Sequence, residues 1–203
     1  FIAGWLISLF KFKLKNESLT EAKPGIKTIL SLLNHDKRLL SFFILICLYY
    51  VFNSPTLMFI NLYYNEIGGT NTQIGIAFAL QSVFELPFFF WGKKLIDTFG
   101  SRKILIFIML IASFRMFLYG INSNPWIAMA IGSLHGITLG LFLVAVIDYT
   151  HRIVPENQNS TGQSVLYTFL SIGTCTGNFL NGIMKDTISL KNAMLLNSLI
   201  VLI

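Results

Sequence analysis

Long apolar runs alternate with short polar segments along the whole chain. Five runs have the length of roughly 17–25 residues that an α-helix needs to cross a hydrocarbon layer of about 30 Å. They cover residues 39–63, 72–91, 104–121, 126–149 and 161–183. Shorter apolar stretches lie at both ends, at residues 1–10 and 192–203. We interpret these as parts of two further helices, so we expect the chain to be an internal piece of a larger protein.

The composition agrees with this pattern. Of the 203 residues, 54% are hydrophobic and only 12% are charged, about half the charged share of a soluble domain. The mean hydropathy is +0.68. The net charge of +6 does not indicate a nucleic-acid partner, because the Lys and Arg residues lie between the apolar runs, as the positive-inside rule requires. We therefore predict an all-α membrane protein.

The connecting segments predict the topology. Residues 11–37 carry an excess of Lys, and residues 92–103 carry four cations and one acid, so both are expected in the cytoplasm. Residues 65–71 and 122–125 carry no cation and are expected outside. This divides the chain into the end of one transmembrane helix (1–10), a cytoplasmic loop (11–37) and a transmembrane bundle (38–203).

Three local patterns predict helix geometry. Pro55 follows Asn53 and Ser54 inside the first span; it should kink the helix, with neighbouring side chains satisfying the freed carbonyl groups. Thr70 and Gln73 have capping-box spacing at the start of the second span. Residues 173 and 177 of the fifth span are both glycine, which favours close approach of another helix.

Two ionisable residues lie inside the third and fourth spans. Arg115 is about 9 Å below the outer end of its helix, from six residues at 1.5 Å each. It either snorkels to the interface or faces a polar cavity, where it would pair with a carboxylate or bind a substrate. His135 lies near the midplane, with small or polar neighbours that include Thr138. It is either a hydrogen-bonded packing residue or a proton relay.

A third ionisable residue, Glu85, lies slightly past the midplane of the second span. Burial there favours the protonated carboxyl, which suits a proton carrier; the alternative is a structural carboxyl bonded to a neighbouring helix. Gln81 is one turn away on the same face, and Asn53 could join them from the first span. Asp148 lies near the cytoplasmic end of its helix and is interpreted as a gate or loop contact. We expect Arg115, His135 and Glu85 to line one aqueous path.

The cytoplasmic loop resembles a signature of the major facilitator superfamily. That signature has a Gly, then an Asp, then a further Gly with basic residues, and the matching positions here are Gly92, Asp97, Gly100, Arg102 and Lys103. The spacing departs from the pattern, because Gly92 and Asp97 are five apart where the family has four. A role for Asp97 as an interhelix latch is therefore not carried over.

The third and fourth spans resemble a narrower branch of this superfamily, the one containing lactose permease and the nucleoside and oligosaccharide proton symporters. The resemblance rests on Ser-Phe-Arg115, Asn-Pro-Trp126 and Leu-His135-Gly, with Glu85-Leu-Pro in the second span. Lactose permease has a coupling Glu three residues after its His, and this chain has Thr138. The resemblance implies a helical bundle of the major facilitator type: the C-terminal six-helix half, with about five complete helices and partial helices at both ends.

The resemblance and the buried charges together predict a secondary active transporter, a proton symporter for a sugar, oligosaccharide or nucleoside, in the plasma membrane. The expected partners are a small-molecule substrate, protons, membrane lipid and the N-terminal half of the same transporter. A drug or metabolite efflux antiporter and a non-transporting sensor or scaffold are the alternatives. No metal-ligand spacing, phosphate loop or nucleophile motif is found, so we expect no cofactor, no metal and no enzyme activity.

Overall fold

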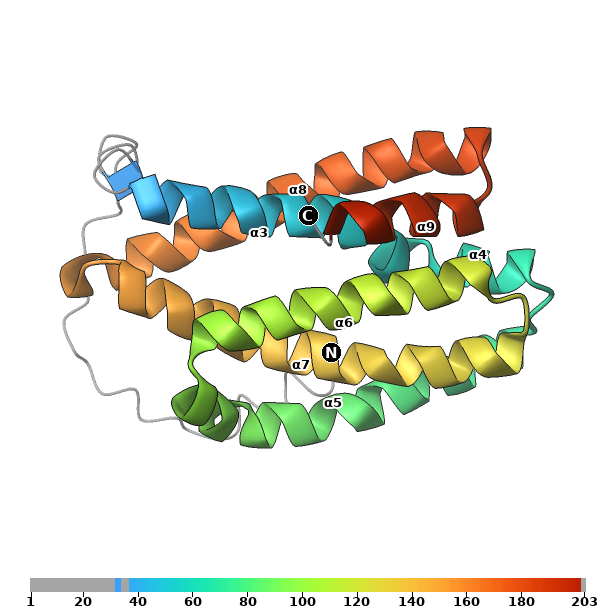
Figure 1. The fold of residues 1–203 in the computed structure, drawn as a ribbon, viewed down its shortest axis with the longest axis horizontal. Coiled ribbons are helices and arrows are strands. Elements are labelled where there is room, and N and C mark those ends of the chain that lie inside the picture. Colours follow the sequence, from blue (N-terminus) through green and yellow to red (C-terminus); the bar gives the residue numbers. More distant parts are fainter. Residues whose placement is uncertain (1–31, 34–36, 202–203) are drawn as a thin grey trace, which may run out of the picture.

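The chain runs back and forth as long helices that lie side by side (Figure 1). In this computed structural model, residues 32–33 and 37–201 are described. The elements are α3 (Lys37–Met58), α4 (Ile60–Glu66), α5 (Asn71–Phe99), α6 (Ser101–Ile121), α7 (Pro125–Ile153), the short 3₁₀ helix η1 (Glu156–Gln158), α8 (Asn159–Thr187) and α9 (Leu190–Val201). Within the described ranges every element is helical, which confirms the predicted all-α bundle.

Four helix pairs make most of the packing: α5 lies on α7, α3 on α8, and α6 on both α7 and α9. In Figure 1 the α5–α6 turn and the η1 segment lie at one end of the bundle, and α4 and the α6–α7 turn lie at the other. The charge pattern assigns the first of these ends to the cytoplasm. Buried residues of α3, α6, α7 and α8 form the larger apolar core.

Among the described residues, four helices, α3, α5, α6 and α7, are long and apolar enough to cross a membrane. The predicted fifth span corresponds to α8, which has 29 residues, the same length as α5 and α7. Its many Ser, Thr, Gly and Asn residues explain why it is less apolar than the other four. Since α8 packs along α3, it lies inside the same bundle.

The predicted cytoplasmic loop at residues 92–103 is wrong in detail. Helix α5 continues through Gly92 and Asp97 to Phe99, and α6 begins at Ser101. The turn is a single residue, Gly100, whose φ of +84° is a conformation that favours glycine. No helix-breaking residue lies between 93 and 99, so the polar composition marked the membrane boundary rather than the end of the helix.

The predicted kink in the first span is a break between α3 and α4 at Phe59, four residues after Pro55. Pro55 has no N–H to donate to the carbonyl oxygen of Val51, one turn earlier. The side chain of Asn181, on α8, donates to that oxygen instead at 3.1 Å. Asn197, on α9, donates in turn to the Asn181 side-chain oxygen. The freed carbonyl is satisfied from a neighbouring helix, as the sequence predicted.

The small residues of α8 make this contact possible. A Cβ on Gly173 would lie 2.5 Å from the carbonyl oxygen of Cys47, and one on Gly177 would lie 2.6 Å from that of Val51. Both distances are shorter than a van der Waals contact, so only glycine fits here. The predicted capping box is also confirmed: Thr70 and Gln73 bond each other reciprocally at the start of α5.

The predicted division at residues 10 and 37 stays a prediction. Residues 1–10 lie outside the described residues, and of 11–37 only residues 32–33 and 37 are described. Helix α9 has 12 residues, where the start of a last helix was expected.

Candidate functional site: a buried cation between α3, α6 and α7

Arg115, on α6, is 1% exposed although its side chain carries a positive charge. Its guanidinium donates to the hydroxyl of Thr56 on α3 at 2.9 Å and to that of Thr138 on α7 at 3.1 Å. It also contacts Nδ1 of His135 on α7, and a longer bond of 3.5 Å reaches the side-chain oxygen of Asn53. One cation therefore connects three helices.

All of these partners are neutral. Among the described residues, no carboxylate lies within ion-pair distance of the guanidinium. The Nε atom of Arg115 is buried and has no partner in the described part of the chain. A buried cation is costly without a counter-charge, and an unsatisfied buried donor is uncommon in a native structure. The side chain is buried rather than snorkelling to the interface. The carboxylate partner expected in the alternative interpretation is not found among the described residues, and a substrate role for Arg115 stays a prediction.

His135 is half-buried beside Arg115. Its main-chain carbonyl accepts the hydroxyl proton of Thr138 at 3.1 Å, so Thr138 and His135 form one unit on α7. We expected the glycines around His135 to leave room beside the ring, but they serve helix packing. A Cβ on Gly136 would lie 2.6 Å from the carbonyl oxygen of Phe84, and one on Gly140 would lie 3.1 Å from that of Glu85.

A small cavity of about 10 Å³ adjoins the cluster, close to the volume that one water molecule needs. Its walls are Tyr49, Tyr50, Asn53, Leu57, His135, Thr138, Leu139 and Phe142. The rings of Tyr49 and Phe142 stack with centroids 5.3 Å apart. Arg115 is not among the lining residues, so it lies behind His135, Thr138 and Asn53 as seen from the cavity.

The structure does not bring Glu85 into this cluster. Glu85 is half-buried on α5 and forms no hydrogen bond or ion pair within the described ranges. Gln81, one turn away, is 8% exposed. It lies against Gly132, where an added Cβ would meet its amide nitrogen at 3.0 Å and the hydroxyl of Tyr119 at 3.2 Å. Both residues therefore belong to the contact between α5 and α7.

Thr56 is a member of the cluster that the sequence analysis missed. Its hydroxyl bonds both the main-chain and the side-chain oxygen of Asn53, at 2.9 and 2.8 Å. The signal was present, because residues three apart share a helix face and Asn53 was already a candidate. The prediction for this part of the helix concerned only the kink at Pro55.

The residues of the loop signature lie around the turn between α5 and α6, at the end of the bundle that is predicted to face the cytoplasm. Asp97 pairs with Lys93 of its own helix at 2.8 Å. The link between helices is made by Lys93 and Asp148 of α7, at 3.1 Å, and Asp148 also binds Arg152 at 2.6 Å. Asp148 thus contacts Lys93 of α5 and Arg152 of its own helix, and its interpretation as a gate or loop contact stays a prediction. Gly92 packs against α7, where a Cβ would lie 3.4 Å from Val144.

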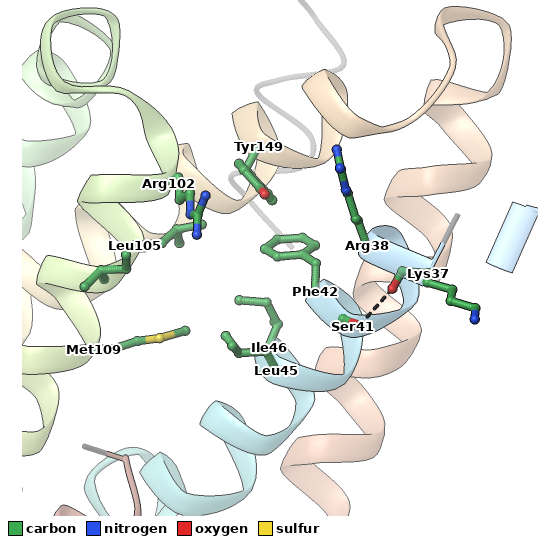
Figure 2. A pocket seen from close by; sticks show the side chains of 11 residues that line it. Lys37, Arg38, Ser41, Phe42, Leu45, Ile46, Arg102, Leu105, Met109 and Tyr149 are labelled. Atoms are coloured by element: carbon green, nitrogen blue, oxygen red, sulfur yellow. Dashed lines mark hydrogen bonds between the residues drawn. The ribbon is translucent and has the colours of Figure 1, made fainter. Parts of the chain in front are cut away.

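A cavity of about 570 Å³ lies between α3, α6 and α7, at the end of the bundle that is predicted to face the cytoplasm. Figure 2 shows Phe42 and Tyr149 between Arg102 of α6 and Arg38 of α3, with the two rings 4.6 Å apart. Lys103, next to Arg102, is exposed. None of the bonds of Arg115 reaches a residue of this cavity, so the cavity is separate from the buried cluster.

This chain is similar to known proteins along most of its length. The MFS_1 like family matches residues 3–196. The chain is 26% identical over 178 residues to the "Uncharacterized transporter YwbF" of Bacillus subtilis, which covers 86% of this chain and 43% of that protein. It is 31% identical over 109 residues to a maltose permease of Geobacillus stearothermophilus, covering 54% and 27% of the two chains.

A third relative is the staphylopine export protein of Staphylococcus aureus, 25% identical over 138 residues, with 68% of this chain and 34% of that protein covered. The matches therefore span less than half the length of each of these relatives. The relatives are all named for transport or export, and the apolar helices are those of a multi-pass membrane protein.

Proposed function

The chain belongs to the MFS_1 like family, and on that premise we propose that it is half of a proton-coupled symporter for a sugar, oligosaccharide or nucleoside. The observation that carries this proposal is the cation cluster of Arg115 and His135 beside an aromatic-lined cavity. An ionisable side chain in a membrane bundle is expensive and marks a substrate or ion pathway by default. We place the whole transporter in the plasma membrane.

The cavity has the chemistry of a site for a ring-shaped polar substrate. Tyr49, Tyr50 and Phe142 supply flat apolar faces, on which a sugar ring or a nucleobase can stack. Asn53 and His135 supply polar groups at the edge. Sites for small molecules commonly combine apolar walls with a few such polar groups. The likeness to a maltose permease supports the sugar class in particular.

The site is incomplete in this half. A volume of about 10 Å³ accepts about one water molecule, far less than a sugar. In transporters built from two similar halves, the substrate binds between them near the midplane and is released when they rock. We propose that the facing half supplies the remaining walls. The unsatisfied Nε of Arg115 fits a cluster that rearranges during this cycle.

Glu85 is the proposed proton carrier. It is the carboxyl nearest the middle of α5, it is half-buried, and no cation among the described residues holds it ionised. A carboxyl in such surroundings takes up a proton readily, and it can release the proton when water reaches it from the other side. Its separation from Arg115 means that coupling would pass through the contact between α5 and α7.

The test uses the full-length parent protein in vesicles, with a pH electrode in the medium. Maltose, sucrose and uridine are added in turn, to wild type, Glu85→Gln and Glu156→Gln. Glu156 is an exposed carboxyl of η1 and is the matched control. Alkalinisation of the medium in wild type and Glu156→Gln, lost in Glu85→Gln, is the expected result. No proton movement with any compound would overturn symport, and alkalinisation that persists in Glu85→Gln would remove the carrier role from this residue.

Efflux is the second candidate, favoured by the likeness to the staphylopine export protein. An antiporter moves protons and substrate in opposite directions, so the same electrode separates the two. Substrate added outside an exporter would not alkalinise the medium. The non-transporting alternative fits poorly, because a scaffold has no need of a charge that is 1% exposed in the middle of a membrane bundle.

A further inference from the structure

The cavity is separated from Arg115 by the residues that Arg115 holds. The lining includes Asn53, His135 and Thr138 but not Arg115, and all three accept contacts from its guanidinium. A substrate in this cavity would therefore meet the partners of Arg115 rather than Arg115 itself. The role of the cation is to determine which hydrogen-bonding groups these partners still offer.

The contact between Arg115 and His135 determines which nitrogen of the imidazole ring carries the proton. A guanidinium can only donate hydrogen bonds, so Nδ1 of His135, which it contacts, must be an acceptor and carries no proton. In a neutral ring the remaining proton is then on Nε2. A doubly protonated ring would place an N–H and a second positive charge against the guanidinium. Nε2 forms no hydrogen bond within the described part of the chain, although His135 lines the cavity.

The hydrogen-bond acceptors of Thr138 and Asn53, the neighbours of His135, are already occupied. The Thr138 hydroxyl accepts from Arg115 and donates to the main chain of His135. The side-chain oxygen of Asn53 accepts from Thr56 and from Arg115. The Asn53 amide donates to the oxygen of Tyr49 at 3.4 Å, which leaves the Tyr49 hydroxyl proton available. What remains for a ligand is chiefly a set of donors: the Nε2–H of His135, the Tyr49 O–H and the second amide proton of Asn53. The Tyr50 hydroxyl, which also lines the cavity, can donate or accept.

We propose that Arg115 is a positioning residue: it fixes His135 as the Nε2–H form, so that the cavity offers hydrogen-bond donors and selects substrates by their acceptor oxygens. This inference rests on the proposed function, since it assigns the substrate groups recognised by the same site. Hydroxyl and ring oxygens of a sugar and carbonyl oxygens of a nucleobase are such acceptors. Arg115 acts on them only through its neighbours, chiefly His135 and Asn53.

The experiment is nitrogen NMR of the full-length protein in bilayers, labelled with ¹⁵N at histidine and arginine, without substrate. Protonated and unprotonated ring nitrogens have well-separated shifts, and His135→Gln identifies the signals of this ring. We expect a single neutral form with the proton on Nε2, and a ¹⁵N–¹⁵N correlation between Nδ1 and an arginine side chain. Arg115→Lys supplies the assignment of that arginine by removing the correlation.

Arg115→Met tests whether Arg115 is what keeps the proton of the His135 ring on Nε2. It keeps an unbranched chain but removes every donor, so a second population with the proton on Nδ1 should appear; Arg102→Met, at an exposed position of the same helix, should leave the ring signals unchanged. A proton on Nδ1 in wild type, or no correlation to an arginine, would overturn the proposal even if Arg115→Met failed to fold. No step of this test needs transport, so its failure is distinguishable from failure of the symport assay.

Discussion

Replacing Asn181 by Leu tests how the bundle tolerates the proline in α3. Leu has the same branched arrangement of four side-chain heavy atoms as Asn but cannot donate to the carbonyl oxygen of Val51, which Asn181 now satisfies at 3.1 Å. Asn181 is 1% exposed, so water does not substitute. An unpaired buried carbonyl costs about 1–3 kcal/mol, and we expect Asn181→Leu to lower the free energy of unfolding by at least that amount, because the bonds to Gly177 and Asn197 are lost as well.

The free-energy cost of the unpaired Val51 carbonyl can be measured separately with a second substitution, Pro55→Ala. Alanine restores the main-chain N–H that donates to Val51 in an unbroken helix, so the bond from Asn181 becomes redundant. The other bonds of Asn181, to Gly177 and Asn197, are the same in both backgrounds and cancel in a double-mutant cycle. The cost of Asn181→Leu should therefore be about 1 kcal/mol or more smaller in the Pro55→Ala protein.

The assay is equilibrium unfolding of the full-length protein in mixed micelles with increasing SDS, followed by tryptophan fluorescence. Asn192→Leu, at an exposed position of α9, is the control and should change stability by less than about 0.5 kcal/mol. Equal costs of Asn181→Leu in both backgrounds, within about 0.3–0.5 kcal/mol, would refute the reasoning. The Val51 carbonyl would then not depend on α8.

Three further predictions concern helix packing, an ion pair and the hydrogen bonds of His135. Gly177→Val should disrupt the contact between α3 and α8 and reduce the yield of folded protein, whereas Gly182→Val, where an added Cβ meets nothing nearer than 4.0 Å, should not; equal yields by size-exclusion chromatography would contradict the packing. Asp148→Asn should lower the unfolding free energy by less than about 1 kcal/mol, because its partners are exposed, and a change unaltered by 0.5 M salt would contradict an ionic origin. His135→Gln, whose amide can accept from Arg115 and donate to the cavity, should retain more substrate uptake than His135→Leu; equal loss in both would show that the donor and acceptor pattern is not what matters.

The spans could be predicted from sequence because each follows from a local rule. Apolar runs of membrane length gave α3, α5, α6 and α7, and the capping box gave the start of α5 at Thr70 and Gln73. The end of α5 could not be predicted in this way. A helix that leaves the membrane keeps its main-chain hydrogen bonds in water, so the polar residues after Gly92 mark the interface but do not end the helix. Only the φ of Gly100 shows the turn.

The site could be predicted only in part. Depth along each helix identified Arg115, about 9 Å below the outer end of its helix, and His135, near the midplane, as residues inside the bundle, and the structure places them in contact. The depth of a residue along its helix does not show which face of that helix packs against which neighbouring helix. For that reason the grouping of Glu85 with this pair was not reproduced, and Thr56 was not foreseen. The orientation of α5, with its main chain against Gly136 and Gly140, depends on tertiary packing that no short pattern contains.

The central claim, that the cluster around Arg115 forms the transport site, is tested most directly by substrate counterflow. Vesicles with the full-length protein are loaded with an unlabelled substrate from the panel above, and entry of the labelled compound is followed without a proton gradient. Lys94→Met, at an exposed position of α5, should exchange substrate like wild type, and a correctly folded Arg115→Met should lose at least about tenfold, equivalent to 1.4 kcal/mol. Exchange at the wild-type rate in Arg115→Met would contradict the account.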